Sequence, residues 1–303
     1  MSAAARRMLC LGEALVDLIG EEAVDSIGQV RRFAPHFGGT VANVAVVAAR
    51  AGAAVALAGG AGDDQWGHWL LARLTEEEVD VSRFALLPEV QTQLAFVAID
   101  SDGEPTYLLY GEPAQTLVEA IGDRVAEIVG EAAGLLISSN TLAGEGERAV
   151  TMHARDVARE LGRPIVFDCN LRLHRWSSRA DAGASANACV PGALLVRANQ
   201  AEAELMTGES DPERAAVALR KAGAQLVAIT LGSGGAILRG TERADVAAFQ
   251  ARMVSTVGAG DAFTGTLVAR LVLSDFYPSA VAASLSEAAH AAAKACERWG
   301  SLD

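Results

Sequence analysis

The sequence predicts an α/β fold: a doubly wound, mostly parallel sheet with a small β-sheet lid. Two observations lead to this prediction. Short apolar runs alternate with longer helical segments along the chain, and such alternation is typical of a parallel sheet covered by helices on both faces. One hairpin-like segment interrupts the alternation and does not fit a parallel sheet.

The expected strands of the central sheet are short apolar runs bounded by polar or glycine residues. They lie at 8–11, 54–58, 135–138, 165–167, 194–196 and 226–230. The expected helices between them are alanine-rich or amphipathic. They lie at 41–51, 66–74, 146–161, 201–206, 212–222, 260–272 and 279–298.

The hairpin is expected where residues 94–100 and 105–110 flank the turn sequence Ser-Asp-Gly at 101–103. With segments near 16–19 and 30–34, it would form a small sheet outside the central one. We therefore expect a single domain over 1–303 with lid segments near 14–36 and 92–112. Such a lid can close over an active site, and the alternative is an edge addition without a function.

Composition limits the partners of the chain. Its 303 residues carry a net charge of −13, which argues against a nucleic-acid-binding surface because phosphate contacts need a basic face. No apolar run approaches the roughly 18 residues of a spanning helix, so no membrane partner is expected. The apolar stretch within the first ten residues is too short for a signal peptide. The four cysteines are scattered along the chain, which fits a reducing compartment. We expect a cytoplasmic protein.

Several motifs that would indicate other function classes are missing. The sequence contains no Walker A motif, no G-x-G-x-x-G, no H-E-x-x-H and no G-x-S-x-G. Their absence weakens P-loop, zinc and hydrolase interpretations. It also argues against a doubly wound dehydrogenase, which the fold class alone would allow.

The segment 255–265, Ser-Thr-Val-Gly-Ala-Gly-Asp-Ala-Phe-Thr-Gly, carries the most chemical information. Small residues at Gly258, Ala259 and Gly260 let the backbone approach a ligand, and the helix expected after them offers free N–H groups to a phosphoryl group. Asp261 would repel a bound phosphate, but it suits a general base that takes a proton from an attacking hydroxyl. From the residues alone an alternative stays open, in which Asp261 is an ordinary first-turn helix residue and the glycines form a tight turn.

Residues 255–268 resemble the C-terminal signature of the ribokinase-like (PfkB) carbohydrate kinases. The family's N-terminal signature is matched by Gly-Gly-Thr-Val-Ala-Asn-Val-Ala at 38–45 and continues through 48–52 and 59–67. The resemblance covers nearly the whole chain and is greatest to fructokinase-type members. It implies an ATP-dependent sugar kinase in which Asp261 is the general base and the backbone of 258–260 is the anion hole.

The resemblance also implies a nucleotide site and a metal site. The nucleotide-binding candidates are Asn199, Thr230, Gly232, Gly235 and His290. Asn199 to Glu202 look like the family's N-x-x-E motif, in which Glu202 would hold Mg²⁺ through waters. Taken alone, these residues also fit a helix capped by Asn199 with a solvated Glu202. A plain turn is the alternative for 230–235.

The sugar-binding candidates lie in three segments of the chain. They are Asp17, Gly38, Gly39, Asn43, Asp168 and Asn170. Asp17 matches the family's G-E-x-x-x-D start, and a carboxylate can accept hydrogen bonds from sugar hydroxyls. The segment 168–176 resembles the D-x-N-x-R…W segment of fructokinase-type and 2-keto-3-deoxygluconate-kinase-type members. Arg172 would neutralise the transferring phosphate, and a structural ion pair is the alternative.

Departures from the family pattern leave the sugar open. Ser255 stands where many members carry an Asp associated with a monovalent cation, so dependence on K⁺ is in doubt. Gly111 stands where fructokinase-type members often carry an Arg, and Gln93 replaces a small residue. We predict transfer of the γ-phosphate of ATP, with Mg²⁺, to a primary hydroxyl of a small sugar, with fructose as the first candidate. The alternatives are 2-keto-3-deoxygluconate, ribose or a nucleoside as substrate, or a non-catalytic sugar-binding regulator. A homodimer formed through the lids is a further expectation.

Overall fold

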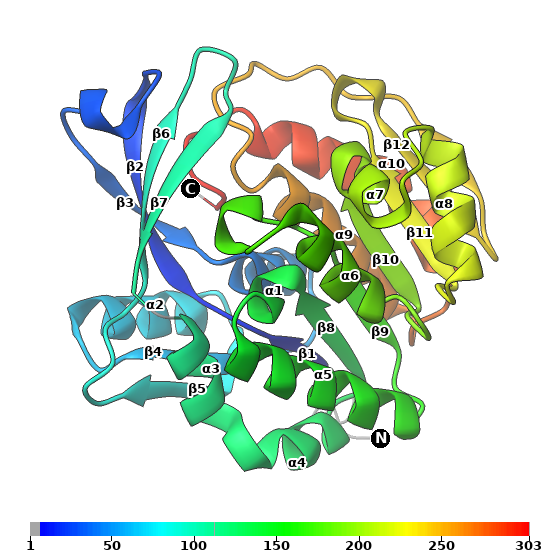
Figure 1. Cartoon of the computed structure of the whole chain (residues 1–303), viewed down its shortest axis with the longest axis horizontal. Coiled ribbons are helices and arrows are strands. Elements are labelled where there is room, and N and C mark those ends of the chain that lie inside the picture. Colours follow the sequence, from blue (N-terminus) through cyan, green and yellow to red (C-terminus); the bar gives the residue numbers. More distant parts are fainter. Residues whose placement is uncertain (1–6, 112, 303) are drawn as a thin grey trace.

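The computed structural model describes residues 7–111 and 113–302, with the side chains of 113–115 left aside. Over these residues the chain forms a large sheet flanked by helices and a smaller sheet that projects from one edge (Figure 1). The large sheet has nine strands in the order β13-β12-β11-β10-β9-β8-β1-β4-β5. Neighbours from β11 to β5 are parallel, and β12 and β13 are antiparallel. The predicted mostly parallel sheet is confirmed.

The strands of the large sheet include all six that the sequence predicts. Their bounds are β1 Met8–Leu11, β4 Val55–Gly62, β5 Asp80–Leu87, β8 Gly134–Ser138, β9 Ile165–Asp168, β10 Leu195–Asn199, β11 Leu226–Thr230, β12 Ala236–Gly240 and β13 Ala244–Val246. The sequence analysis missed β5, β12 and β13. The edge strands β5 and β13 are largely half-exposed, so they lack the apolar run that marks a buried parallel strand.

Helices cover both faces of the sheet, as a doubly wound fold requires. One face holds α1 Thr40–Arg50, α2 Gln65–Glu76, α9 Ala259–Leu273 and α10 Ser279–Ala295. The other holds α3 Pro113–Ile121, α4 Val125–Gly130, α5 Glu145–Glu160, α6 Arg179–Ala188, α7 Gln200–Thr207 and α8 Pro212–Lys221. Side chains of β1 alternate between these two apolar layers, with Met8 and Cys10 in one and Leu9 and Leu11 in the other. No helix in the described part of the chain is long and apolar enough to cross a membrane.

The lid is the four-stranded sheet of β2 Leu15–Ala23, β3 Ala34–Gly38, β6 Leu94–Ile99 and β7 Pro105–Tyr110, in the order β3-β2-β6-β7. The predicted hairpin is present as the antiparallel pair β6–β7. The strand expected near 30–34 is wrong in its bounds, because β3 begins only at Ala34. A 3-10 turn over Ile27–Gln29 and irregular backbone at 30–33 precede it.

The lid is rooted at the carboxyl edge of the large sheet. The chain enters the lid directly after β1 and again after β5. At β1 the strand order reverses, since β4 lies on one side of it and β8 on the other. Open α/β sheets bind ligands at the carboxyl ends of strands at such a point. The fold therefore places a ligand site between β1 and the lid.

Candidate active site

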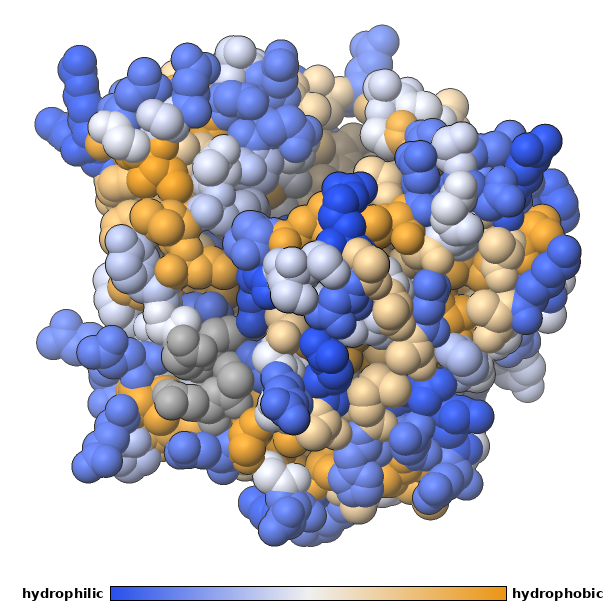
Figure 2. All heavy atoms as spheres, viewed as in Figure 1, coloured by the Kyte–Doolittle hydropathy of each residue, from blue (hydrophilic) through white to orange (hydrophobic). Residues whose placement is uncertain are grey.

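A cavity lies between the lid and the carboxyl edge of the large sheet. Figure 2 shows the molecule hollowed between the lid strands and the helical body. The predicted residues Asp17, Gly39, Asn43, Arg172 and Asp261 line the cavity, as does Gly258. The space open to the centres of water molecules is about 60 Å³, which is room for a few waters.

Asp261 lies in the first turn of α9, and this helix begins directly after Gly258, whose φ is +78°. Its side chain is buried, and its Oδ2 accepts a hydrogen bond of 2.8 Å from Asn43 Nδ2. Burial raises the pKa of Asp261 to about 7, although the Asn43 hydrogen bond and the nearby Arg172 lower it. A carboxylate that titrates near neutral pH can both hold and release a proton, which is what a general base needs.

The N-terminus of α9 offers backbone donors beside Asp261. Among the described residues, the N–H groups of Gly258, Gly260 and Asp261 have no acceptor, whereas the Ala259 N–H donates to the Thr256 carbonyl at 3.2 Å. Close packing requires the small residues here. A Cβ on Gly260 would lie 2.8 Å from Nη1 of Arg197. Free N–H groups at a helix N-terminus can bind a transferring phosphoryl group.

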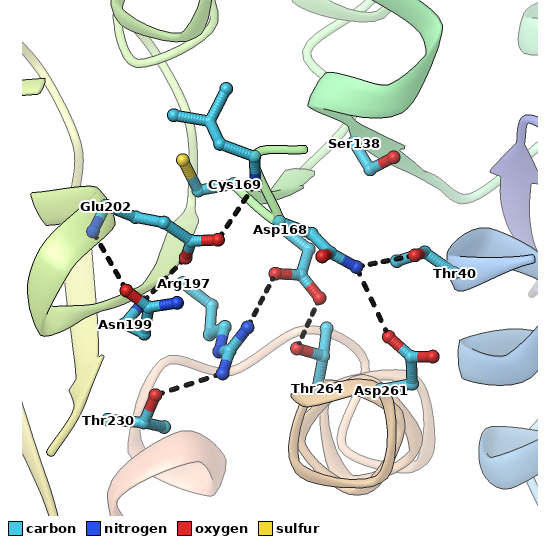
Figure 3. Close-up of polar contacts among 12 residues, drawn as sticks. Thr40, Ser138, Asp168, Cys169, Arg197, Asn199, Glu202, Thr230, Asp261 and Thr264 are labelled. Atoms are coloured by element: carbon cyan, nitrogen blue, oxygen red, sulfur yellow. Dashed lines mark hydrogen bonds and ion pairs between the residues drawn. The ribbon is translucent and has the colours of Figure 1, made fainter. Parts of the chain in front are cut away.

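Arg197, in the middle of β10, lies beside α9 and connects several strand ends by hydrogen bonds (Figure 3). Its Nη1 donates to Asp168 Oδ1 at 3.2 Å and its Nη2 to Thr230 Oγ1 at 3.0 Å. The second oxygen of Asp168 accepts from Thr264 Oγ1 at 2.8 Å. Asp168 is fully bonded and does not line the cavity, so this geometry favours a structural role over the sugar-binding role predicted from the sequence. The sequence analysis missed Arg197, whose signal is a charge within an apolar strand.

Asn170 lies close to both Asp168 in the sequence and Asp261 in space, but it does not line the cavity. It has a left-handed backbone, φ +34°. Its Nδ2 donates to Thr40 Oγ1 at 2.5 Å and lies 3.5 Å from Asp261 Oδ1. Asn140 Nδ2 also donates to Thr40 Oγ1. These contacts hold the lower edge of the site rigid around the general base candidate.

Glu13 is a cavity residue that the sequence analysis did not single out as a ligand. Its Oε1 accepts from the Thr40 N–H at 3.2 Å and from Asn140 Nδ2 at 3.1 Å. Its Oε2 is buried and has no partner among the residues that the structure describes. Burial raises the pKa of this carboxyl above its usual value. Glu13 thus orients the start of α1 and leaves one acceptor facing the site.

Asp17 projects from β2 on the lid side of the cavity. Its carboxylate accepts no hydrogen bond from any described residue. Burial raises the pKa of Asp17 to about 7, and the negative charges of Asp261 and Glu13 add to this, while Arg172 opposes it. Gly38 gives Asp17 its room, since a Cβ at Gly38 would lie 2.4 Å from Asp17 Oδ2. This acceptor can bind a hydroxyl of a ligand.

Arg172 reaches the cavity from the loop after β9. Its guanidinium lies over the ring of Tyr107 on lid strand β7, 5.4 Å from the centroid. Tyr107 also stacks on His174 at 6.5 Å. The alternative of a structural ion pair finds no partner for Arg172 in the described chain. The guanidinium is therefore available to a phosphate, and its contact with Tyr107 joins the body to the lid.

Glu202 and Asn199 form a capping box at the start of α7. Asn199 Oδ1 accepts from the Glu202 N–H at 2.8 Å, and Glu202 Oε2 accepts from the Asn199 N–H at 2.8 Å. Glu202 Oε1 accepts from the Leu171 N–H at 2.8 Å. Glu202 is buried rather than solvated. Across the described residues no group of three His, Cys, Asp or Glu side chains could hold a metal directly, so the Mg²⁺ role of Glu202, through waters, stays a prediction.

The remaining nucleotide candidates lie outside the sugar cavity. Thr230 pairs with Asn199 in the register of β10 and β11. Gly232 begins a 3-10 turn, and Gly235 ends it with φ +90°, where a Cβ would lie 1.9 Å from the Val246 carbonyl oxygen. His290 on α10 meets the ring of Phe249 edge-on at 5.0 Å. Their roles in nucleotide binding stay predictions.

Comparison with known proteins identifies the family. Residues 5–302 match the model of the pfkB family carbohydrate kinases. The chain belongs to this family. It is 31% identical to fructokinase-1 of Oryza sativa subsp. japonica, over 90% of this chain and 85% of the rice protein. The predicted family and the sugar kinase class are confirmed.

Solved structures of other sugar kinases share the fold. The fructokinase of Vibrio cholerae O395, solved with fructose, ADP and a calcium ion, is 27% identical with a TM-score of 0.84, covering 99% of this chain and 95% of that chain. The aminoimidazole riboside kinase of Salmonella enterica, solved with aminoimidazole riboside and an ATP analogue, is 25% identical with a TM-score of 0.82. That match covers 98% of this chain and 94% of the Salmonella chain. The predicted ribokinase-like fold is confirmed.

Proposed function

We propose that this kinase transfers the γ-phosphate of ATP to a primary hydroxyl of a small sugar, with fructose as the first candidate. One observation carries the proposal: the buried carboxylate of Asp261 lies in a cavity beside N–H groups of α9 that have no acceptor among the described residues. The likeness to fructokinases supports fructose. The likeness to the riboside kinase keeps a nucleoside as the second candidate.

In this proposal each cavity residue has a defined task. Asp261 takes the proton of the sugar hydroxyl as that hydroxyl attacks the phosphorus. The N–H groups of Gly258 and Gly260 and the guanidinium of Arg172 stabilise the charge on the transferring phosphoryl group. Asp17 and the buried, unpartnered Oδ1 of Asn43 accept hydrogen bonds from the other sugar hydroxyls. Asp168 and Asn170 would position Arg197, Thr264 and Asp261 through their hydrogen bonds without contacting the sugar.

We place the nucleotide along the turn at Gly232–Gly235 and the start of α9, bordered by Asn199, Thr230 and His290. Mg²⁺, when bound, would neutralise charge on the phosphates, and Glu202 would hold its water ligands. Carboxylate and water oxygens are the donors that Mg²⁺ prefers. Ser255 is fully buried, and its Oγ accepts from the Val257 N–H at 3.0 Å. Many family members carry an Asp associated with a monovalent cation at position 255. Because this chain has Ser255 there instead, we expect turnover without K⁺.

The test is ADP release from Mg·ATP in the presence of fructose, ribose, 2-keto-3-deoxygluconate, other hexoses and nucleosides, each with and without K⁺. We expect fructose to give the strongest response and K⁺ to change it little. A stronger response to a nucleoside would select the second candidate. ATP binding without turnover of any sugar in the set would instead support the non-catalytic regulator.

The domain organisation and the dimer also stay proposals. We propose one domain over 1–303 with lid segments near 14–36 and 92–112, and a cytoplasmic location.

The outer face of the lid carries Phe33, Phe96 and Tyr110 in edge-to-face contact, with Leu108 and Tyr110 45% and 56% exposed. Figure 2 shows apolar side chains over these strands. We propose that this face joins two copies, and sedimentation of the protein and of its Leu108→Glu variant tests it, since a wild-type monomer would refute the dimer.

A further inference from the structure

The segment 297–302, which follows α10, contributes Ser301 to the lining of the cavity. Trp299 packs against the apolar cluster between the lid and the body. Gly300 lies against lid strand β3, because a Cβ there would be 2.4 Å from Nδ1 of His36. The Leu302 carbonyl accepts from Arg50 Nη1 of α1 at 3.0 Å. The segment is therefore fixed on one side by the lid and on the other by the body.

Ser301 is 2% exposed and lines the same cavity as Asp17 and Asp261. Its backbone carbonyl accepts from Arg298 Nη2 at 2.9 Å, which fixes the main chain. Its Oγ has no hydrogen-bond partner among the described residues. Buried hydroxyl groups are nearly always bonded, because an unmet donor costs free energy. A hydroxyl held in this state at a ligand cavity points to a partner that arrives with the ligand.

Gly258 explains how Ser301 comes so close to the catalytic loop. A Cβ on Gly258 would lie 2.6 Å from Ser301 Oγ and 2.5 Å from Ser301 Cα. Only a glycine at this position leaves room for the serine. The hydroxyl thus lies where the predicted acceptor hydroxyl of the sugar, Asp261 and the start of α9 meet.

We propose that the Ser301 hydroxyl donates a hydrogen bond to a hydroxyl of the bound sugar and so contributes to sugar specificity. This inference rests on the proposed sugar kinase function. The other unpartnered polar groups of the cavity, Asp17, Glu13 Oε2 and Asn43 Oδ1, are acceptors. A sugar hydroxyl that donates to one of them still has lone pairs, and Ser301 supplies a neutral donor for one of these. The phosphoryl group already has the N–H groups of Gly258 and Gly260, so the sugar is the better partner.

The first experiment compares Ser301→Ala with the wild-type chain and with Ser286→Ala, which removes an exposed hydroxyl from α10. Fructose binding is measured by calorimetry without nucleotide, or, where fructose does not bind, with the sugar that releases most ADP. We expect Ser301→Ala to raise the sugar Kd and KM about three- to tenfold, the usual effect of one neutral hydrogen bond. The KM for ATP and kcat should change less than twofold, and Ser286→Ala should behave as wild type. An unchanged sugar Kd, or a loss confined to kcat, would overturn the proposal.

A second experiment pairs the variant with monodeoxy analogues of the same sugar. Wild type should lose more affinity than Ser301→Ala for the analogue that lacks the hydroxyl contacted by Ser301, because the variant has already lost one of the two hydrogen bonds of that hydroxyl. Equal penalties for every analogue in both proteins would refute the contact. Ser301→Cys keeps the volume with a weaker donor and should show the same loss if Ser301→Ala folds poorly. If the wild-type chain binds sugar without phosphorylating it, the kinase proposal fails, but the binding comparison still decides the role of Ser301.

Discussion

Two groups of buried carboxylates lie at the same edge of the sheet, and they differ in how many hydrogen bonds they accept from the chain. Asp168 and Glu202 accept hydrogen bonds on both of their oxygens, from Arg197, Thr264 and backbone N–H groups. Asp17 and Glu13, by contrast, keep oxygens that no residue in the described part of the chain bonds. Burial of a charge costs free energy unless partners compensate it. The first group is compensated within the chain, whereas the second awaits a ligand.

Topology explains the difference between the two groups. Asp168 ends β9 and Glu202 begins α7, so adjacent strands and helix starts supply them with donors. Asp17 lies on lid strand β2 and Glu13 in the loop between β1 and β2, and both line the cavity. Among the described residues, none donates a hydrogen bond to the Asp17 carboxylate or to Glu13 Oε2. Four predictions separate the two groups.

The largest effect is expected from Asp261→Asn. The amide keeps the size of the side chain but cannot take a proton, so kcat should fall by about 10²–10⁴. ATP binding should stay at the wild-type level because the start of α9 is unchanged. The measurement is steady-state ADP release with the best sugar of the panel, with nucleotide binding followed by calorimetry. Turnover near the wild-type rate would refute the role of Asp261 as base.

The sequence predicted the parts of the site that depend on local motifs. The segments around Gly258 and Gly38 predicted Asp261 and Asn43, and the G-E-x-x-x-D start predicted Asp17. The structure brings all three to one cavity. The alternation of strands and helices predicted the sheet because each element repeats a local pattern. The half-exposed strands β5 and β13 were missed because exposure at a sheet edge removes the pattern on which the prediction depends.

The rest of the site depends on contacts between distant parts of the chain. The Asp168 side chain meets Thr264, 96 residues away, and this contact determines that Asp168 is bonded rather than open to a ligand. Ser301 faces the cavity only because the segment after α10 passes between the lid and α9. The local sequence has no signal for the hydrogen bonds that occupy both oxygens of Asp168. It also has no signal for the hydroxyl of Ser301, which has no partner among the described residues.

The second prediction concerns the compensated group. Asp168→Asn keeps an acceptor for Thr264 but leaves the guanidinium of Arg197 buried without its counter-charge. Removal of one partner from a buried ion pair typically costs about 3–5 kcal/mol of stability. Urea unfolding at neutral pH measures this free energy of unfolding.

The matched control for Asp168 is Glu287→Gln. Glu287 pairs with Arg270 at 2.9 Å, and the two side chains are 48% and 38% exposed. Exposed pairs contribute about 0–1 kcal/mol, so this variant should unfold near the wild-type urea concentration. Equal losses in the two variants would show that Asp168 is not a structural carboxylate and would return it to the sugar site.

The third prediction concerns Asp17, on the lid side of the cavity. Asp17→Asn replaces a charged acceptor with a neutral one, and hydrogen bonds to charged groups contribute about 1.5–3 kcal/mol. The sugar KM should therefore rise at least about tenfold while the KM for ATP stays constant. Asp25→Asn, at an exposed position of the lid segment, is the control and should match wild type. A rise in the KM for ATP that equals the rise for the sugar would argue against Asp17 as a sugar ligand.

The smallest effect is expected in the stability of the ligand-free protein. Burial raises the pKa of both Asp17 and Asp261 from 3.8 to about 7. Between these two values the folded state holds protons that the unfolded state has released, so these groups make the protein less stable as pH rises from about 4 to 7. Asp261→Asn and Asp17→Asn remove this dependence. Each variant should therefore melt a few degrees higher than wild type at pH 8 and show a smaller gain at pH 5.

Thermal unfolding of wild type and the two variants at pH 5 and pH 8 tests this, and the difference between variant and wild type cancels the titration of other groups. Glu287→Gln should show no gain at either pH, because its side chain is 48% exposed. If the gains of the Asp17 and Asp261 variants were the same at both pH values, the two carboxylates would not be held protonated in the cavity. A gain that grows with pH would mean that the buried carboxylates proposed for sugar binding and proton transfer also lower the stability of the free protein.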